Sequence, residues 1–87
     1  MGVTMNNLEF CFNQAVVSGA SYVGVLIEME GFPQPEVIIN KAENINSKLA
    51  YYKKTYDEDL NHRFAKGIKI IGCSYGDGFN DIQEDLT

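Results

Sequence analysis

The most regular hydrophobic pattern in the chain lies between residues 22 and 30, where apolar residues alternate with a mixed set. The apolar set is Val23, Val25, Ile27 and Met29, which in an extended strand all project to one face. The intervening residues are only partly polar, so we expect the second face to be shielded as well. The pattern predicts the central strand of a small sheet.

A helical pattern precedes this strand. Apolar residues recur at spacings of three and four, at Leu8, Cys11, Phe12, Ala15 and Val16. Asn6 and Glu9 resemble a capping box, and Gly19 suits the left-handed position that ends a helix. We therefore predict a helix over residues 7–18. We treat residues 1–5 as a flexible N-terminus or as cloning residues, so that one domain spans residues 6–87.

The central strand ends at a turn that contains Gly31, Pro33 and Pro35, because none of these residues continues a strand ladder well. We expect Phe32, inside this turn, to cover the edge of the core rather than to be exposed. Residues 36–40 are short and β-branched, which predicts a second strand paired with the first as a hairpin.

A second helical stripe follows, formed by Ile45, Leu49, Tyr52, Tyr56 and Leu60. Asn40 with Glu43 resembles a capping box, and Asn44 with Ser47 is a competing start. The helix is therefore predicted from residue 42 or 45 to residue 62.

Residues 68–75 are mostly apolar and predict a third strand, with Ile68, Ile70 and Gly72 on one face. The opposite face would then hold Ile71, Cys73 and Tyr75. The remaining residues form a short acidic tail, in which Phe79, Ile82 and Leu86 have helical spacing.

The order of elements is α-β-β-α-β, which predicts an α+β fold with a three-stranded antiparallel sheet in the order 2-1-3. A right-handed crossover places both helices on one face of this sheet. The other face would carry several apolar residues, drawn from Tyr22, Leu26, Ile38 and Tyr75, which is more than a monomer usually exposes. A homodimer through the sheet face, a partner protein or the tail would cover it.

The net charge of the chain restricts the classes of partner that the protein is expected to bind. Twelve acidic and seven basic residues give a net charge of −5, which disfavours direct binding to nucleic acid or to an anionic membrane. An acidic protein can still bind a basic patch on another protein. Cys11 and Cys73 both lie in apolar patterns and are expected to be small core residues, and no zinc-type spacing exists. A cytoplasmic protein is the resulting expectation.

Catalytic and metal-binding motifs are weak, so we predict no enzyme, no cofactor and no metal site. His62 is the sole histidine and is expected to lie exposed at the end of the second helix. The Gly-rich segment 72–78 lacks the ending of a phosphate-binding loop. The acids near Asp81 and Glu84 do not match a calcium-binding loop.

Aromatic residues cluster at Tyr51, Tyr52 and Tyr56. Tyr52 and Tyr56 share the predicted core stripe, whereas Tyr51 lies off it beside Lys48 and is a candidate surface contact.

Several segments together look like a group of short proteins from Gram-positive bacteria and their phages. They are residues 22–25, 29–33, 38–40, 43–44, 48–56, 67–72 and 75–77, which include Tyr22-Val-Gly-Val, Met29-Glu-Gly-Phe-Pro and Tyr75-Gly-Asp. The resemblance spans nearly the whole domain. It implies a phage or prophage setting and carries over no catalytic or binding residue.

The sequence therefore favours a non-enzymatic interaction protein that binds and modulates a host or phage protein. Candidate contact residues are Tyr75, Asp77, Asp81, Glu84, Asp57 and Glu58. The alternative is a small-ligand-binding or sequestering oligomer, with Tyr75 and the turn at residues 76–78 lining a pocket between subunits.

Overall fold

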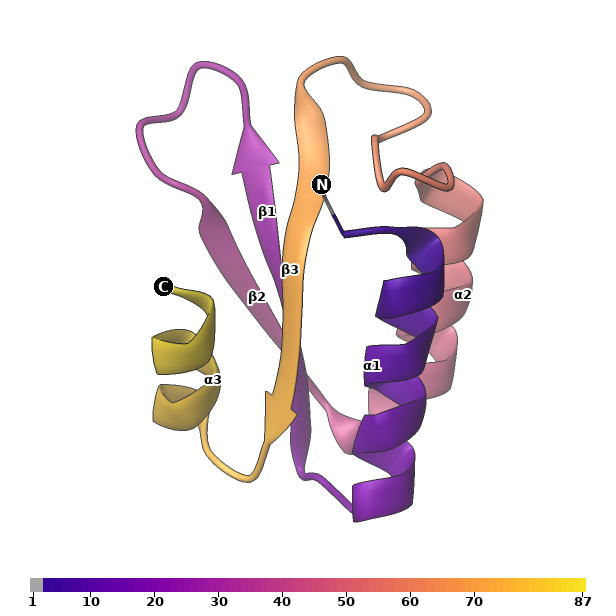
Figure 1. The fold of residues 1–87 in the computed structure, drawn as a ribbon, viewed down its shortest axis with the longest axis vertical. Helices are drawn as coiled ribbons and strands as arrows, with labels where there is room; N and C mark the ends of the chain where they lie inside the picture. Colours follow the sequence, from indigo (N-terminus) through magenta and orange to yellow (C-terminus); the bar gives the residue numbers. More distant parts are fainter. Residues whose placement is uncertain (1–2) are drawn as a thin grey trace.

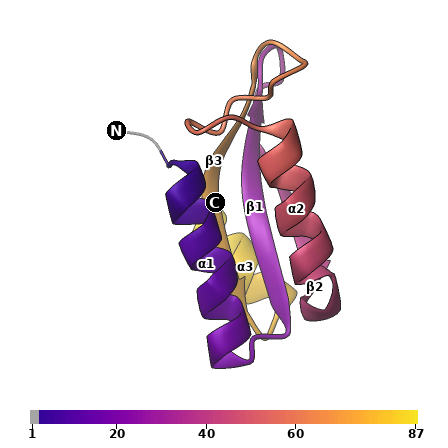
Figure 2. The ribbon, with the colours of Figure 1, turned by 90° about the vertical axis from the view of Figure 1, so that its right-hand side faces the viewer.

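The computed structural model describes residues 3–87 as a three-layered α+β arrangement. The elements are α1 (Met5–Ser18), β1 (Tyr22–Met29), β2 (Glu36–Lys41), a 3-10 turn (Ala42–Asn44), α2 (Ile45–Thr55), β3 (Ile68–Gly76) and α3 (Phe79–Leu86). The strands form one antiparallel sheet in the order β2-β1-β3. Helices α1 and α2 lie side by side on one face and α3 lies on the other (Figures 1 and 2). The predicted fold class and strand order are confirmed.

The central strand has its predicted faces. Val23, Val25 and Ile27 are buried in the core between the sheet and the helices α1 and α2. Phe12 of α1 and Tyr52 of α2 meet in this core, with their ring centroids 6.0 Å apart in an edge-to-face arrangement. The larger part of the hydrophobic core is therefore on the face that both predicted helices cover.

A β-bulge in β3 changes which residues share a face. Leu26 pairs with Gly72 and Ile27 with Ile70, so Ile71 has no partner on β1. The predicted alternation along β3 is therefore wrong beyond the bulge. Cys73 and Tyr75, opposite Val25 and Val23, lie on the same face as Ile68 and Ile70.

The second face of the sheet also differs from the expectation. Ile38 and Tyr75 both pair with residues of the α1–α2 face and are absent from the second face, whereas Tyr22 and Leu26 are on it as predicted. The tail forms α3 and covers part of this face, because Ile82 is fully buried there. A Cβ atom on Gly24 would lie 2.6 Å from Ile82 Cγ2, so the absence of a side chain at Gly24 is what lets α3 approach.

The first helix begins earlier than predicted. Thr4 is the N-cap and forms a capping box with Asn7, so the predicted box of Asn6 and Glu9 is wrong. Asn7 N–H donates to Thr4 Oγ1, and Thr4 N–H donates to Asn7 Oδ1 at 2.9 Å. Of the five terminal residues that we left aside, Thr4 and Met5 thus form the helix start, and Met1 and Gly2 lie outside the described residues. Gly19 ends α1 in the left-handed region, as predicted.

The second helix ends at Thr55, seven residues before the predicted end. Asp57 Oδ1 accepts hydrogen bonds from the backbone N–H groups of Asp59 and Asn61, which competes with helical bonding. Leu60 then adopts a positive φ of 64°, which is uncommon for a non-glycine residue, and its side chain is fully buried. The apolar spacing of Tyr56 and Leu60 therefore reflects burial in a loop and not helix. The start at Ile45 matches one predicted alternative, while Asn40 lies in β2 and does not cap.

The prediction that both cysteines are small core residues holds in part: Cys73 packs against the core, but the two residues are bonded to each other. Cys11 of α1 and Cys73 of β3 form a disulfide, with their Cα atoms 6.5 Å apart. Sixty-two residues separate them in the sequence, so the pairing depends on the docking of α1 against β3. The disulfide fixes this helix to one edge of the sheet.

Candidate functional site

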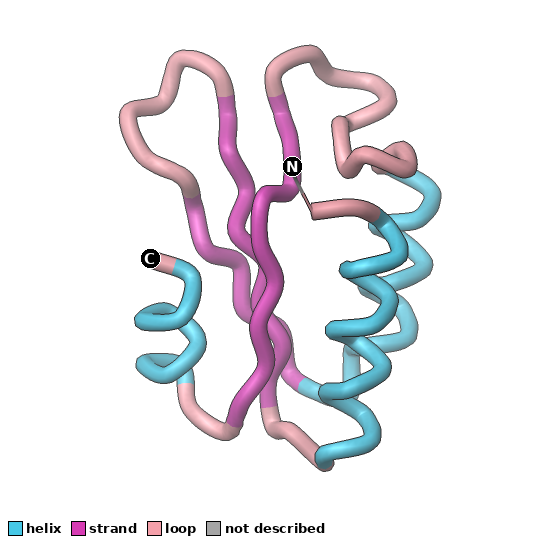
Figure 3. Tube along the Cα trace, in the orientation of Figure 1, coloured by secondary structure: helices cyan, strands magenta, loops and turns pink. Residues whose placement is uncertain are grey.

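The two edge strands of the sheet differ in how their outward backbone groups are used. At the β3 edge, Ile70 N–H donates to Leu60 O at 3.0 Å, and His62 N–H donates to Ile68 O at 2.8 Å. The loop that makes these bonds, residues 56–67, lies at the same end of the sheet as the β1–β2 turn (Figure 3). Part of the β3 edge is therefore already paired within the chain.

The β2 strand has an open edge. Ala42 N–H donates to Ser21 O at 2.9 Å, so these two residues are a hydrogen-bonded pair at the end of the β1–β2 ladder. Because inward and outward groups alternate along an antiparallel strand, Val37, Ile39 and Lys41 direct their N–H and C=O groups away from the sheet. Among the described residues, no backbone group of another segment bonds to these three. We call this row of three residues the β2 edge.

A groove of about 280 Å³ lies beside the β2 edge, between α2 and the sheet. It is lined by Ile27, Met29, Glu36, Ile38, Lys48, Tyr51, Tyr52, Tyr56, His62 and Ile68, and we call it the tyrosine groove. Its floor is the α1–α2 face of all three strands, and its wall is α2. At helical spacing, Lys48 and Tyr51 project from α2 on the side away from Lys53, which contacts α1. The groove therefore opens towards β2.

Aromatic rings continue from the groove into the loop. Ring centroids lie 5.4 Å apart for Tyr51 and Tyr52, 5.9 Å for Tyr52 and Tyr56, and 5.0 Å for Tyr56 and His62. Tyr52 is buried and Tyr51 is 49% exposed, so the row of rings runs from core to solvent. Lys48 Nζ lies 5.3 Å from the centre of the Tyr51 ring, within reach of a cation–π interaction. Tyr51 is therefore an exposed aromatic residue at the groove rim, and its role as a surface contact stays a prediction.

Burial changes the acid–base properties of the groove wall. Desolvation by burial raises the pKa of Tyr52 to about 12, with smaller contributions from Tyr56 and Tyr51. Burial also raises the pKa of Tyr56. Both phenols therefore stay protonated further into the alkaline range than an exposed tyrosine does.

The prediction that His62 lies at the end of the second helix is wrong, because α2 ends at Thr55. The histidine lies in the loop after α2, half-buried between Tyr56 and Phe64, and its Nδ1 accepts a hydrogen bond from Phe64 N–H at 3.1 Å. Since Nδ1 is the acceptor, the neutral imidazole carries its proton on Nε2. In this tautomer, Nε2–H is the hydrogen-bond donor of the ring.

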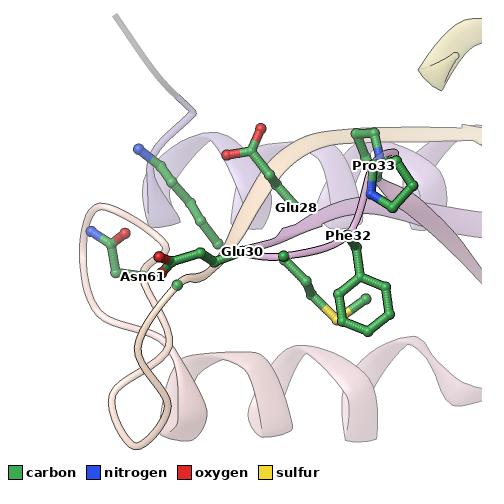
Figure 4. Close-up of a pocket in the computed structure, with 10 residues that line it drawn as sticks. Glu28, Glu30, Phe32, Pro33 and Asn61 are labelled. Atoms are coloured by element: carbon green, nitrogen blue, oxygen red, sulfur yellow. The ribbon is translucent and has the colours of Figure 1, made fainter.

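A second hollow, of about 470 Å³, lies at the tip of the β1–β2 hairpin. Figure 4 shows Glu28 and Phe32 pointing to opposite sides of the hairpin. Phe32 is 63% exposed, so the prediction that it covers the core edge is wrong. Glu30 N–H donates to Gly67 O at 2.8 Å, which ties the hairpin tip to the loop after α2. Glu28, Glu30 and Asn61, which line this hollow, are exposed.

The six contact residues predicted from the sequence do not form one surface. Asp57 and Glu58 belong to the loop after α2, Tyr75 and Asp77 lie at the far end of β3, and Asp81 and Glu84 are exposed on α3. Two of these acids have structural hydrogen bonds. Asp57 organises its loop, and Asp77 Oδ1 accepts hydrogen bonds from both the N–H and the hydroxyl of Ser21, at 3.0 and 3.2 Å.

The open β2 edge and the tyrosine groove were not identified from the sequence. The available signals were the tyrosine cluster and the short β-branched strand at residues 36–40, which we assigned to separate parts of the fold. Their association depends on how α2 packs over the sheet, and local patterns do not specify that.

Three negative findings complete the description of residues 3–87 and of the chain's relatives. Within residues 3–87, no group of three or more His, Cys, Asp or Glu side chains is placed to hold a metal ion. In the same range, no helix combines the length and the apolar character that crossing a membrane requires. No protein-family model, no curated protein and no solved structure matches the chain. The case for a function therefore depends on the geometry of the site.

Proposed function

We propose that this protein is a non-enzymatic binding protein that takes up an extended segment of a partner protein as a fourth strand along the β2 edge. The observation that carries the proposal is the row of outward backbone groups at Val37, Ile39 and Lys41, directly beside an aromatic groove. Strand addition of this kind obtains affinity from main-chain hydrogen bonds and specificity from pockets for alternate side chains.

The register of the sheet defines where those side chains go. Residues of an added strand opposite Glu36 and Ile38 project to the α1–α2 face, as Glu36 and Ile38 themselves do. They therefore enter the tyrosine groove, which both of these β2 residues line. Residues opposite Val37 and Ile39 project to the face that α3 partly covers.

The chemistry of the groove favours one large apolar or aromatic side chain in the bound segment. Ile27, Met29 and Ile68 provide an apolar floor, while Tyr51 provides an aromatic ring at the rim. Exposed tyrosines at the edge of a pocket are frequent hot spots of binding. Lys48 at the same rim favours an acidic residue nearby. The resemblance described above would make the partner a host or phage protein.

The test is a selection from a random peptide library displayed on phage, followed by titration of the selected peptides. We expect a consensus with apolar residues at alternate positions. Ile39→Pro, which removes an outward N–H group, should weaken binding at least tenfold, whereas the control Ile39→Val should not. Tyr51→Ala should weaken it by a similar factor, about 1–2 kcal/mol. Peptides that bind wild type and Ile39→Pro equally well would refute strand addition.

The contribution of the acidic residues on α3 is tested in the same titration. Reversing the charges of Asp81 and Glu84 should leave peptide binding unchanged, because both lie on the opposite side of the sheet from the groove. A large loss of peptide affinity on charge reversal would show that α3 is the contact surface, as the acidic pattern of the sequence first suggested.

The second candidate is a small-ligand site in the tyrosine groove alone. Three tyrosines and Nε2–H of His62 supply polar groups beside an apolar floor, which is typical of such sites. A fragment library screened by thermal shift would test this alternative. A ligand whose stabilisation is lost in Tyr51→Ala but retained in Ile39→Pro would favour the small-ligand function over strand addition.

A further inference from the structure

The disulfide between Cys11 and Cys73 borders an open hollow at the β3 edge. The hollow has a volume of about 520 Å³ and is lined by both cysteines, by Asn7 of α1 and by Asp85 and Leu86 of α3. Its walls therefore come from both sides of the sheet. Neither cysteine is fully buried. A small reagent can thus reach the disulfide from solvent while α1 stays packed on the sheet.

The chain leaves the β3 edge open beside this hollow. The loop after α2 bonds to β3 at Ile68 and Ile70, before the bulge at Ile71. Among the described residues, no backbone group from outside the sheet bonds to Cys73. Bulges are frequent beside functional sites, where they interrupt regular pairing. The loop therefore does not screen the disulfide from solvent.

We propose that this hollow is a site of thiol–disulfide exchange, where a small dithiol reduces the Cys11–Cys73 bond in the folded protein. A thiolate of the dithiol attacks one cysteine sulfur, forms a mixed disulfide with it and displaces the other cysteine as a thiolate. The second thiol of the reagent then releases the first cysteine and closes a cyclic disulfide. Two electrons pass from the dithiol to the protein, and the two thiol protons end on Cys11 and Cys73. The exchange uses neither the β2 edge nor the tyrosine groove and is independent of the proposed function.

Asp85 is the one charged residue among the described residues that line the hollow. Its Oδ2 accepts a hydrogen bond from Ser74 Oγ at 2.9 Å, which orients the carboxylate beside the hollow. A fixed negative charge attracts a cationic reagent and repels an anionic one. We therefore expect the site to react with neutral and cationic thiols in preference to anionic thiols.

The exchange couples the stability of the fold to the thiols around the protein. The disulfide joins residues that are 62 positions apart, and its reduction removes a restriction on the unfolded chain. The reduced protein is therefore the less stable form. Because the hollow gives access to the disulfide in the folded protein, reduction does not have to wait for the chain to unfold.

The kinetics of reduction test access in the folded state. Wild type is incubated with excess dithiothreitol, quenched by alkylation at a series of times and analysed by mass spectrometry. The rate should rise in proportion to the dithiol concentration, and urea well below the unfolding midpoint should change it by no more than about twofold. A rate that reaches a plateau with dithiol concentration and rises steeply with urea would show that the disulfide reacts only after unfolding, and would overturn the proposal.

Thiols of different charge test the role of Asp85. Cysteamine is cationic, mercaptoethanol is neutral and mercaptoethanesulfonate is anionic, and each rate is corrected for the thiolate fraction and nucleophilicity of the reagent. The ratio of the cysteamine rate to the sulfonate rate should fall about threefold in Asp85→Asn, because the attracting charge is removed. Asparagine keeps a hydrogen-bond acceptor for Ser74, so the melting temperature should stay close to that of wild type.

Asp81→Asn is the matched control for Asp85→Asn. It changes the net charge of the chain by the same amount and lies on the same helix, but outside the hollow. Its ratio of rates should stay close to that of wild type. A ratio that falls equally in both variants, or in neither, would show that the reagent does not approach past Asp85 and would overturn the assignment of the exchange site to this hollow.

Discussion

The two edges of the sheet differ in how much of each is paired within the chain. The β3 edge is joined to α1 through the Cys11–Cys73 disulfide and pairs with the loop after α2 at Ile68 and Ile70. The β2 edge has no such internal partner among the described residues. An unpaired edge is an aggregation hazard that proteins usually protect. Here Pro35 precedes the strand and Lys41 ends it, which limits pairing to a short stretch.

The comparison shows that the chain covers part of one edge of its sheet and leaves the other unpaired. The covered edge, β3, is held by the loop after α2, in which Leu60 adopts a positive φ, and by the Cys11–Cys73 disulfide. We therefore propose the open β2 edge beside the aromatic groove as the binding surface, and the predictions below distinguish the two edges by experiment.

The largest effect is expected from breaking the disulfide. Cys11→Ala with Cys73→Ala should destabilise the fold by about 4 kcal/mol, because the closed loop of 62 residues no longer restricts the unfolded chain. This corresponds to a fall in melting temperature of at least about 15 °C. Differential scanning calorimetry measures it, and adding a thiol reductant should lower the melting temperature of wild type but not of the double variant. Equal stability of the two proteins would contradict the structural role.

Alkaline pH should weaken the core behind the open edge. The pKa of Tyr52 is raised by burial to about 12 in the folded protein, against about 10 in the unfolded chain. Below pH 10 both states are protonated and the full stability is present. Between about pH 10 and 12 the unfolded state loses its proton first, so stability falls as pH rises, by up to about 3 kcal/mol.

Denaturant titrations at several pH values, compared between wild type and Tyr52→Phe, test this dependence. The variant should lose less stability over the same interval, because the group that titrates only in the unfolded state has been removed. An identical alkaline loss in both proteins would show that Tyr52 does not control it.

Proline substitutions compare the edges directly. At Ile70 the N–H group is bonded to Leu60 O, whereas at Ile39 it points outward. Relative to alanine at the same position, proline should cost about 1–3 kcal/mol at Ile70 and less than about 1 kcal/mol at Ile39. The alanine variants correct for lost side-chain packing. Similar costs at both positions would show that the β2 edge is not free.

A smaller effect is expected when the loop that covers the β3 edge is loosened. Asp57→Ala removes two hydrogen bonds to backbone N–H groups and should cost about 1 kcal/mol, while Asp57→Asn keeps an acceptor and should cost less. Hydrogen exchange at the Ile70 amide should become faster in Asp57→Ala, since its acceptor is in that loop. Unchanged exchange would mean that Asp57 does not hold the loop on the strand.

Much of the fold was predictable because its periodic patterns are local. The alternation at Val23, Val25 and Ile27 identified the central strand and its buried face. The close hairpin and the crossover helix then restricted the strand order to one simple arrangement, which the structure has. The amphipathic spacing of Phe79 and Ile82 likewise indicated a third helical segment at the C-terminus.

The candidate site was less predictable, because each part of it depends on contacts between distant segments. Tyr51 was recognised as a surface aromatic, but its position in the same groove as Ile38, beside the β2 edge, depends on the packing of α2. His62 was placed on a helix that ends seven residues earlier, at Thr55, before a loop in which Asp57 accepts backbone hydrogen bonds. Local apolar spacing cannot distinguish a buried loop from a helix when both place residues in the core.

The sequence by itself determined the α+β class, the strand order and the face of β1 that is buried, because these follow from periodicity and short connections. Only the tertiary structure decided the disulfide, the bulge at Ile71, the placement of α3 and the contrast between the two edges. The physical reason is that these features are set by contacts between residues far apart in the chain. A register shift of one residue moves a side chain to the opposite face, and no local pattern encodes that shift.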